Sequence, residues 1–185
     1  LAQAIGGLPE RIAACTTAEQ KLGVLMDAGR DTVAVRPELA RAQLEFMAQA
    51  AVREPSVDMI YSDEDKMSAD GVRSEPFFKP DWSPEYLLST MYTCHFSAYR
   101  TALVRRLGGW RTPYDFAQDY DLALRVAATD PTVRHIPDVL YHWRMVPGSA
   151  ALAFLPKPGA HERARAALQD YLRQTGQDGT VEAGA

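Results

Sequence analysis

Apolar positions along the chain follow two periods, one typical of strands and one typical of helices. Residues 23–27 and 57–62 form short apolar or β-branched runs, which are typical of buried strands. Between them, Pro37 begins a helix that we expect to run to about Ala51. Residues 159–174 form an amphipathic helix whose buried side carries Ala164, Ala167, Leu168, Tyr171 and Leu172. This alternation of strands and helices predicts an α/β fold.

Glycine and proline residues mark the ends of several shorter predicted elements. These elements are a hairpin turn at Asp70 and Gly71, a short helix from Pro84, a strand over 93–100, a helix over 101–107, and two strands over 133–137 and 139–144. We expect Gly108 and Gly109 to stop the helix over 101–107. A turn over residues 109–111 and a mobile loop over 112–117 then lead to a further helix.

That further helix begins near Gln118 and carries two carboxylates in its first turn. Negative charge is favoured at this end of a helix because the helix dipole is positive there. Asp121 and Arg125 are four residues apart and can form an ion pair along the helix. This leaves Asp119 without an evident local partner, so we expect it to face a cleft. The alternative is an N-cap aspartate followed by an intrahelical ion pair.

Composition limits the kinds of partner. The chain has 185 residues, of which 46% are hydrophobic and 24% charged, as in an ordinary globular domain. A net charge of -4 argues against nucleic acid as a partner. No apolar run approaches the length that spans a bilayer. Cys15 and Cys94 fit no metal-binding spacing, and we interpret them as reduced thiols of a cytoplasmic protein, with a disulfide as the alternative.

An acidic run follows the strand predicted over 57–62. Asp63, Glu64 and Asp65 are consecutive, and adjacent carboxylates repel one another unless a cation or a base is near. The alternative is a solvated acidic turn that Lys66 balances. Residues 77–84 form a loop rich in aromatic side chains and limited by two prolines, which suits either a sugar-binding surface or a structural cover of the sheet.

Four stretches in one order carry a family resemblance: residues 58–66, 78–84, 116–125 and 139–144. Together they resemble the second half of the inverting family 2 glycosyltransferases, of the bacterial polysaccharide and O-antigen type. The resemblance covers roughly residues 24–173. It implies a GT-A-like (Rossmann-like) mixed sheet flanked by helices, with an incomplete N-terminal nucleotide-binding half. We therefore expect one partial domain over residues 1–175 and a linker over 176–185.

The resemblance also implies roles for individual residues. Asp119 corresponds to the catalytic base. Asp27, Asp63, Asp65 and His142 correspond to the region that binds a divalent cation, Mn²⁺ or Mg²⁺; Lys79, Trp82, His95 and Arg144 correspond to contacts with the diphosphate or the acceptor. One position departs from the family pattern, because Gly29 stands where a second cation-binding aspartate is expected. The alternatives are a turn residue for Asp27, packed histidines for His95 and His142, and a structural role for Trp82.

The function implied is transfer of a sugar from a nucleotide-sugar donor to a saccharide or lipid-linked saccharide acceptor, in bacterial surface polysaccharide synthesis. We expect this at the inner face of the membrane, within a longer polypeptide that holds other transferase domains. Because the nucleotide half is incomplete, we expect the isolated chain to be inactive. The alternative is a degenerate, non-catalytic module that binds glycan or scaffolds neighbouring domains. A plain α/β interaction domain would explain the composition but not the ordered motifs.

Overall fold

The computed structural model describes residues 37–145 and 158–182 of the chain. The predicted strand over 23–27 lies outside this part, together with Cys15, Asp27 and Gly29. The elements are α3 (Pro37–Arg53), β1 (Met59–Met67), β2 (Arg73–Phe77), α4 (Pro84–Leu87), β3 (Ser97–Tyr99), α5 (Thr101–Arg106), the 3₁₀ turn η1 (Thr112–Tyr114), α6 (Gln118–Ala127), β4 (Val133–Arg144) and α7 (Ala160–Thr175). All the helices predicted within this part are confirmed.

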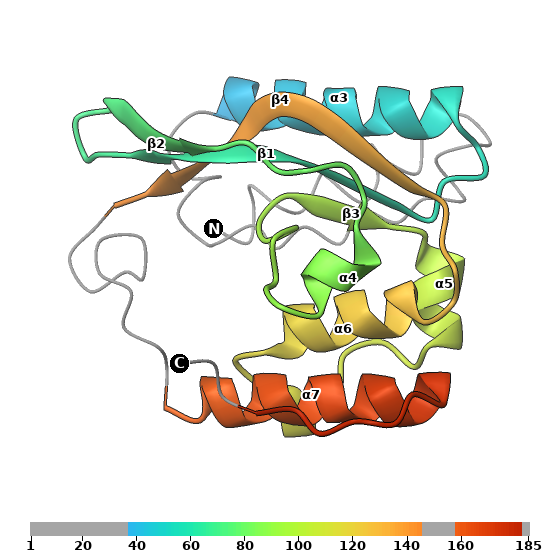
Figure 1. The fold of residues 1–185 in the computed structure, drawn as a ribbon. Helices are drawn as coiled ribbons and strands as arrows, with labels where there is room; N and C mark the ends of the chain where they lie inside the picture. The colour runs from blue at the N-terminus through green and yellow to red at the C-terminus, as the bar shows by residue number, and fades with distance from the viewer. Residues whose placement is uncertain (1–36, 146–157, 183–185) are drawn as a thin grey trace.

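The elements form layers around one mixed sheet. Figure 1 shows α3 along one face of the sheet, α4, α5 and α6 on the other side, and α7 outermost against α6. The order is β2-β1-β3, and β4 pairs with the other edge of β1. This arrangement confirms the α/β class and is consistent with a Rossmann-like fold. The N-terminal end of α6 lies on the same side of the molecule as the C-terminal ends of β1 and β4 (Figure 1).

Strand β4 runs parallel to β1 along the whole length of β1. The sequence predicted two strands here, but the structure has one strand of 12 residues. The register shifts on both sides of Asp63, whose partner is Val139, while the preceding Ser62 pairs with Ile136. Pro137 has no N–H group to donate to a ladder, so an irregularity in the pairing accommodates it. The predicted break at this proline is therefore a bulge within one strand.

The hairpin between β1 and β2 matches its prediction. Met67 pairs with Arg73, and Gly71 turns the chain with a φ of 88°, which glycine adopts without steric cost. The predicted strand over 93–100 is wrong for its first residues, since β3 covers only Ser97–Tyr99. Cys94 and Phe96 have φ values of 38° and 61°, which are incompatible with an extended strand.

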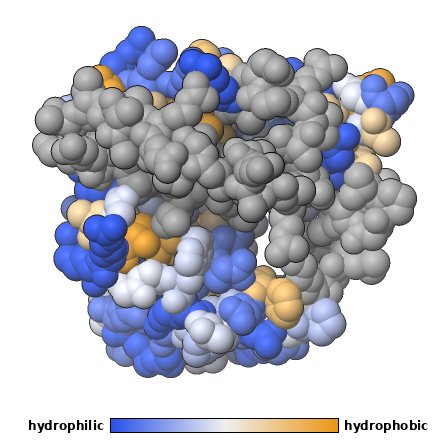
Figure 2. Space-filling view, turned by 180° about the vertical axis from the view of Figure 1, so that it is seen from behind, coloured by the Kyte–Doolittle hydropathy of each residue, from blue (hydrophilic) through white to orange (hydrophobic). Residues whose placement is uncertain are grey.

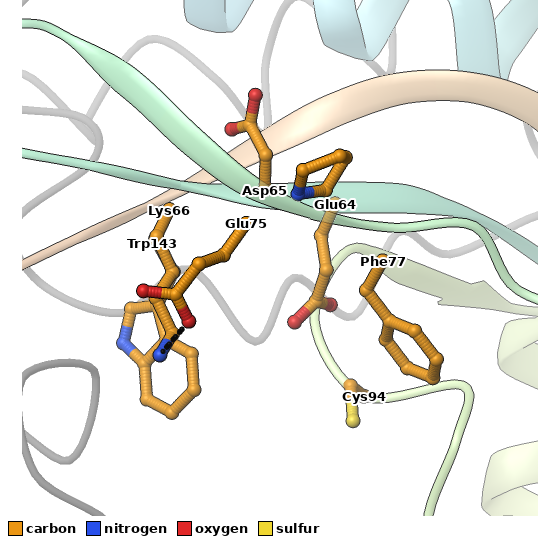
Figure 3. Close-up of a pocket in the computed structure, with 8 residues that line it drawn as sticks. Glu64, Asp65, Lys66, Glu75, Phe77, Cys94 and Trp143 are labelled. Atoms are coloured by element: carbon orange, nitrogen blue, oxygen red, sulfur yellow. Dashed lines mark hydrogen bonds and ion pairs between the residues drawn. The ribbon is translucent and has the colours of Figure 1, made fainter.

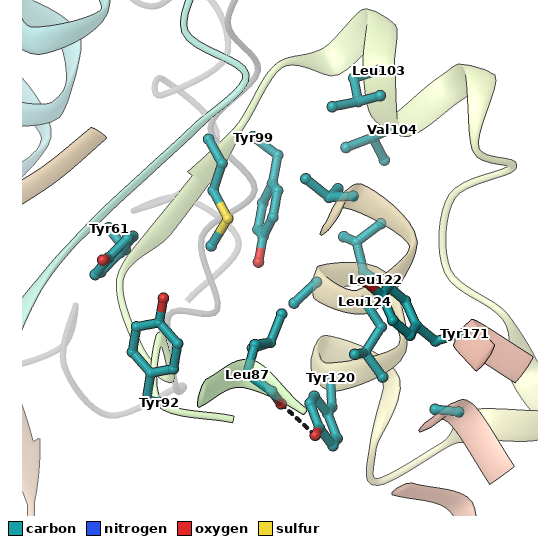
Figure 4. Close-up of a cluster of buried hydrophobic side chains, with 14 residues drawn as sticks. Tyr61, Leu87, Tyr92, Tyr99, Leu103, Val104, Tyr120, Leu122, Leu124 and Tyr171 are labelled. Carbon is teal, nitrogen blue, oxygen red and sulfur yellow. Dashed lines mark hydrogen bonds between the residues drawn. The ribbon is translucent and has the colours of Figure 1, made fainter. Parts of the chain in front are cut away.

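Two hydrophobic clusters hold the layers together. The first joins β1 to α4, α5, α6 and α7 through buried side chains that include Tyr61, Leu87, Leu122 and Tyr171 (Figure 4). The second joins α3 to β1, β3 and β4 and includes Met47, Ile60 and Ile136. Burying a large apolar side chain contributes about 1.5–3 kcal/mol. These clusters therefore fix the sheet between α3 and α6.

In the residues that the structure describes, no helix is long and apolar enough to cross a bilayer. On the side of the molecule shown in Figure 2, hydrophilic residues dominate the described surface, with only small hydrophobic areas between them.

Candidate functional site

The acidic run lies inside strand β1, not in a turn after it. Asp63, Glu64 and Asp65 are buried, with 2%, 6% and 4% of their surfaces exposed. The alternative of a solvated acidic turn is therefore wrong. Burying three adjacent carboxylates is costly unless each has a partner.

Each of the three acids pairs with a different histidine. His135 Nε2 lies 2.9 Å from Asp63 Oδ1, and the ring stacks on Tyr61. The other pairs are His95 Nδ1 with Glu64 Oε1, at 3.0 Å, and His142 Nδ1 with Asp65 Oδ1, at 2.6 Å. Sequence reasoning did not select His135. The available signal was its place in the strand predicted over 133–137; the pairing of this strand with β1 comes from the structure.

Glu64 is the centre of a buried charged group. Lys79 Nζ lies 2.8 Å from Glu64 Oε2, and the Lys79 side chain is 0% exposed. The same ammonium donates to the carbonyl oxygens of Thr93 and His95. Burial raises the pKa of Glu64, but hydrogen bonds and charge from His95 and Lys79 outweigh it, so the pKa lies below its ordinary value. In this geometry Lys79 meets a carboxylate in place of the predicted phosphate.

His95 and Trp82 have structural surroundings. The His95 ring stacks on Tyr141 with centroids 4.7 Å apart, and it also contacts Trp143. Trp82 packs against the first hydrophobic cluster and lies beside Tyr92. Both positions favour the packed alternatives that the sequence left open. Together with Lys79, these residues hold the loop between β2 and α4 to the sheet.

Asp65 and His142, two of the predicted cation ligands, contact each other directly, and they do not form a cation site with Asp63. Asp65 Oδ2 accepts a hydrogen bond from Arg73 at 2.5 Å, so both oxygens are engaged. Within residues 37–145 and 158–182, no group of three or more His, Cys, Asp or Glu side chains could hold a metal ion. The described residues therefore do not fit a divalent cation, and that prediction rests on the resemblance and on Asp27.

A pocket of about 400 Å³ opens beside this polar region. Figure 3 shows Glu64, Phe77 and Trp143 pointing to one side of the sheet, while Asp65 points to the other. Lys66 and Glu75 form an ion pair of 2.7 Å at its edge. Two aromatic side chains and the carboxylates of Glu64 and Glu75, each paired with a lysine, thus face the space. Such a lining suits a hydroxylated ligand better than an anionic one.

The two carboxylates at the start of α6 have different environments. Asp121 is 1% exposed and receives hydrogen bonds from Arg111 and Arg125, whose Nη2 lies 2.7 Å from Asp121 Oδ2. Arg125 also donates to the carbonyl oxygens of Leu107 and Gly109. The hydrogen bond and charge of Asp121, against the opposing effect of burial, raise the pKa of Arg111. The predicted pair of Asp121 and Arg125 is confirmed, and it anchors the turn before α6.

Asp119 is half-buried at the first turn of α6. Its Oδ1 accepts a hydrogen bond from the Tyr120 N–H at 2.9 Å, so the expectation that it lacks a local partner is wrong. The Tyr120 hydroxyl donates to the Leu87 carbonyl oxygen at 2.6 Å and ties α6 to α4 (Figure 4). The helix start that carries Asp119 is thereby fixed in place.

Arg144 lies at the end of β4, two residues after His142. Its Nε is buried and has no hydrogen-bond partner in the described structure. A buried donor without a partner is costly, which distinguishes this guanidinium from Arg111 and Arg125.

Comparison with known proteins gives two partial matches. The chain is 40% identical over 134 residues to the uncharacterized protein y4gI of Sinorhizobium fredii. It is 37% identical over 143 residues to the O-antigen biosynthesis protein RfbC of Myxococcus xanthus. The matches cover 71% and 77% of this chain but only 15% and 11% of those two proteins. No family model matches the chain.

Proposed function

We propose that this chain is part of an inverting glycosyltransferase of bacterial surface polysaccharide synthesis, with Asp119 as the catalytic base. The similarity to RfbC, named as an O-antigen biosynthesis protein, supports the biological role. The ordered motifs support the reaction class. The observation that carries the proposal is the different environment of two neighbouring carboxylates. Asp121 is buried and forms ion pairs with two arginines, whereas Asp119 is half-buried at the same helix start.

The reaction would be a single displacement at the anomeric carbon. The acceptor hydroxyl oxygen forms a bond to that carbon while the bond to the nucleoside diphosphate breaks, and the diphosphate leaves with the bonding electrons. Asp119 takes the proton of the hydroxyl as a general base. Arg144, with its unpartnered Nε, is our candidate for the group that meets the diphosphate.

Substitution in an active polypeptide that contains this sequence tests the base. Asp119→Asn keeps the shape of the side chain but cannot accept the proton, so we expect sugar transfer to fall by about 10²–10⁴-fold. Asp115→Asn is the matched control, because Asp115 is an exposed acid four residues earlier. Near-normal transfer by Asp119→Asn would refute the assignment.

A second candidate function is a non-catalytic module that binds glycan or scaffolds neighbouring domains. The internal pairing of Asp63, Glu64 and Asp65 favours it, because the described residues then offer no cation-binding set. Titration calorimetry with UDP and Mn²⁺, each alone and then together, separates the two candidates. Metal-dependent binding of UDP would support the enzyme and the predicted roles of Asp27 and His142. Absence of binding would favour a truncated or non-catalytic module.

A further inference from the structure

The first turn of α6, which carries Asp119, is not capped by its own sequence. The N-cap residue is Ala117, whose side chain has no hydrogen-bond acceptor, and no capping hydrogen bond forms. Contacts with other segments therefore set where this helix begins. The Ala117 N–H donates to the Tyr114 carbonyl oxygen at 2.8 Å, so the position of Tyr114 bears directly on the start of α6.

One carboxylate of α7 holds the turn that leads into α6. Asp170 Oδ2 accepts a hydrogen bond from the Tyr114 hydroxyl at 2.5 Å and lies 3.0 Å from Arg111 Nη2. The guanidinium carbon of Arg111 lies over the Tyr114 ring, 4.3 Å from its centroid, and the same guanidinium pairs with Asp121. Asp170 thus joins both ends of the segment 111–114 to a helix that follows it by more than 50 residues in the sequence, since Tyr114 and Asp170 are 56 residues apart.

These contacts of Asp170 define a geometry more than they add to stability. Burial raises the pKa of Asp170, but hydrogen bonds from Tyr114, Arg173 and Arg111 outweigh it, so the pKa lies below its ordinary value and the carboxylate is ionised. The side chains of Asp170 and Arg111 are 18% and 30% exposed. Ion pairs that solvent reaches contribute little to the free energy of unfolding. Charge-assisted hydrogen bonds from several donors to one carboxylate nevertheless fix the orientation of the groups that they join.

General-base catalysis depends on such orientation, because the base must lie within hydrogen-bond distance of the proton that it takes. A displacement of about 1 Å, even from a change far from the chemistry, can lower the rate by about 10²-fold. We propose that Asp170 is a positioning residue, which holds Asp119 at the acceptor hydroxyl by fixing Tyr114 and Arg111 before α6. This assignment rests on the proposed function.

Steady-state kinetics of an active polypeptide that contains this sequence test the assignment. Asp170→Ala should lower kcat by about 10–100-fold and leave the KM for the acceptor within about threefold of the wild-type value, because the base acts in the transition state. Tyr114→Phe, which removes one of the hydrogen bonds to Asp170, should give a smaller fall in kcat. Glu162→Ala is the matched control, because it removes an exposed acid of the same helix, and it should leave kcat unchanged.

A double variant separates positioning from a general structural role. If Asp170 acts through Asp119, adding Asp170→Ala to Asp119→Asn should change kcat by less than about twofold. A fall by the same factor in both backgrounds, or a normal kcat for Asp170→Ala alone, would overturn the assignment. In either case a low kcat for Asp119→Asn leaves the proposed base standing. Near-normal transfer by Asp119→Asn refutes the base and, with it, the positioning role of Asp170.

Discussion

The two carboxylates at the start of α6 allow a structural role and a chemical role to be separated by one type of substitution. Asp121→Asn removes a buried charge that two arginines share, whereas Asp119→Asn alters a half-buried side chain two residues away. The two variants have the same change in atoms. Their effects on the free energy of unfolding should nevertheless differ widely.

The magnitude for Asp121 follows from its partner Arg125. Their side chains are 1% and 6% exposed, so the pair is fully buried. Removing one partner of a buried ion pair costs about 3–5 kcal/mol, because the other charge is left without compensation. Arg111 adds less, since 30% of its side chain is exposed and solvent can take over its hydration. For Asp119 we expect a loss below about 1 kcal/mol, because the side chain is only half-buried and Asn keeps an oxygen that can accept from the Tyr120 N–H.

Urea unfolding followed by circular dichroism measures both variants. With a denaturant slope of about 2–3 kcal/mol per molar urea, Asp121→Asn should lower the midpoint by about 1–2 M. Asp119→Asn should shift it by about 0.5 M at most. A midpoint for Asp121→Asn within about 0.3 M of the wild type would refute the reasoning, because the buried pair would then contribute almost nothing. An equally large shift for Asp119→Asn would show that Asp119 is also structural.

Two further predictions concern stability. The pKa of Glu64 is lowered in the folded protein. Ionised Glu64 therefore adds to the free energy of unfolding above pH 4.5, its ordinary pKa, and this contribution is lost as the pH falls through the lower pKa of the folded state. Unfolding of wild type and Glu64→Gln between about pH 6 and pH 3 should therefore show a difference that narrows with falling pH; a constant difference would contradict this. Tyr120→Phe leaves the Leu87 carbonyl oxygen without its donor and should cost about 1–2 kcal/mol in thermal unfolding, whereas Tyr86→Phe, at an exposed ring, should cost little.

The elements with strong local signals were predictable from sequence. The apolar side of α3, the proline at the start of α4 and the glycine in the β1–β2 hairpin each specify their structure within a few residues. The pair of Asp121 and Arg125 was predictable for the same reason, because a spacing of four residues brings side chains together on any helix.

Features that depend on contacts between distant segments were not predictable. The partner of Asp63 is His135, 72 residues later, and no local pattern reveals that β4 lies beside β1. The sequence predicted a break at Pro137, but β4 continues through a bulge there because it pairs with β1 on both sides of the proline. β3 is shorter than predicted because Cys94 and Phe96 have positive φ values. In this segment the His95 N–H donates to Glu64, and Phe96 packs in the second hydrophobic cluster.

The three acid–histidine pairs join β1 to segments that are distant in the sequence. His95 comes from the segment before β3, and His135 and His142 come from the two halves of β4. Because His135 and His142 both lie on β4, a shift of one residue in the pairing of β1 with β4 would separate Asp63 and Asp65 from their histidines. The acidic run thus specifies the alignment of the sheet. The catalytic base of the proposed function, Asp119, comes from a different element, α6, whose start is fixed by Tyr120 and by the buried charge of Asp121.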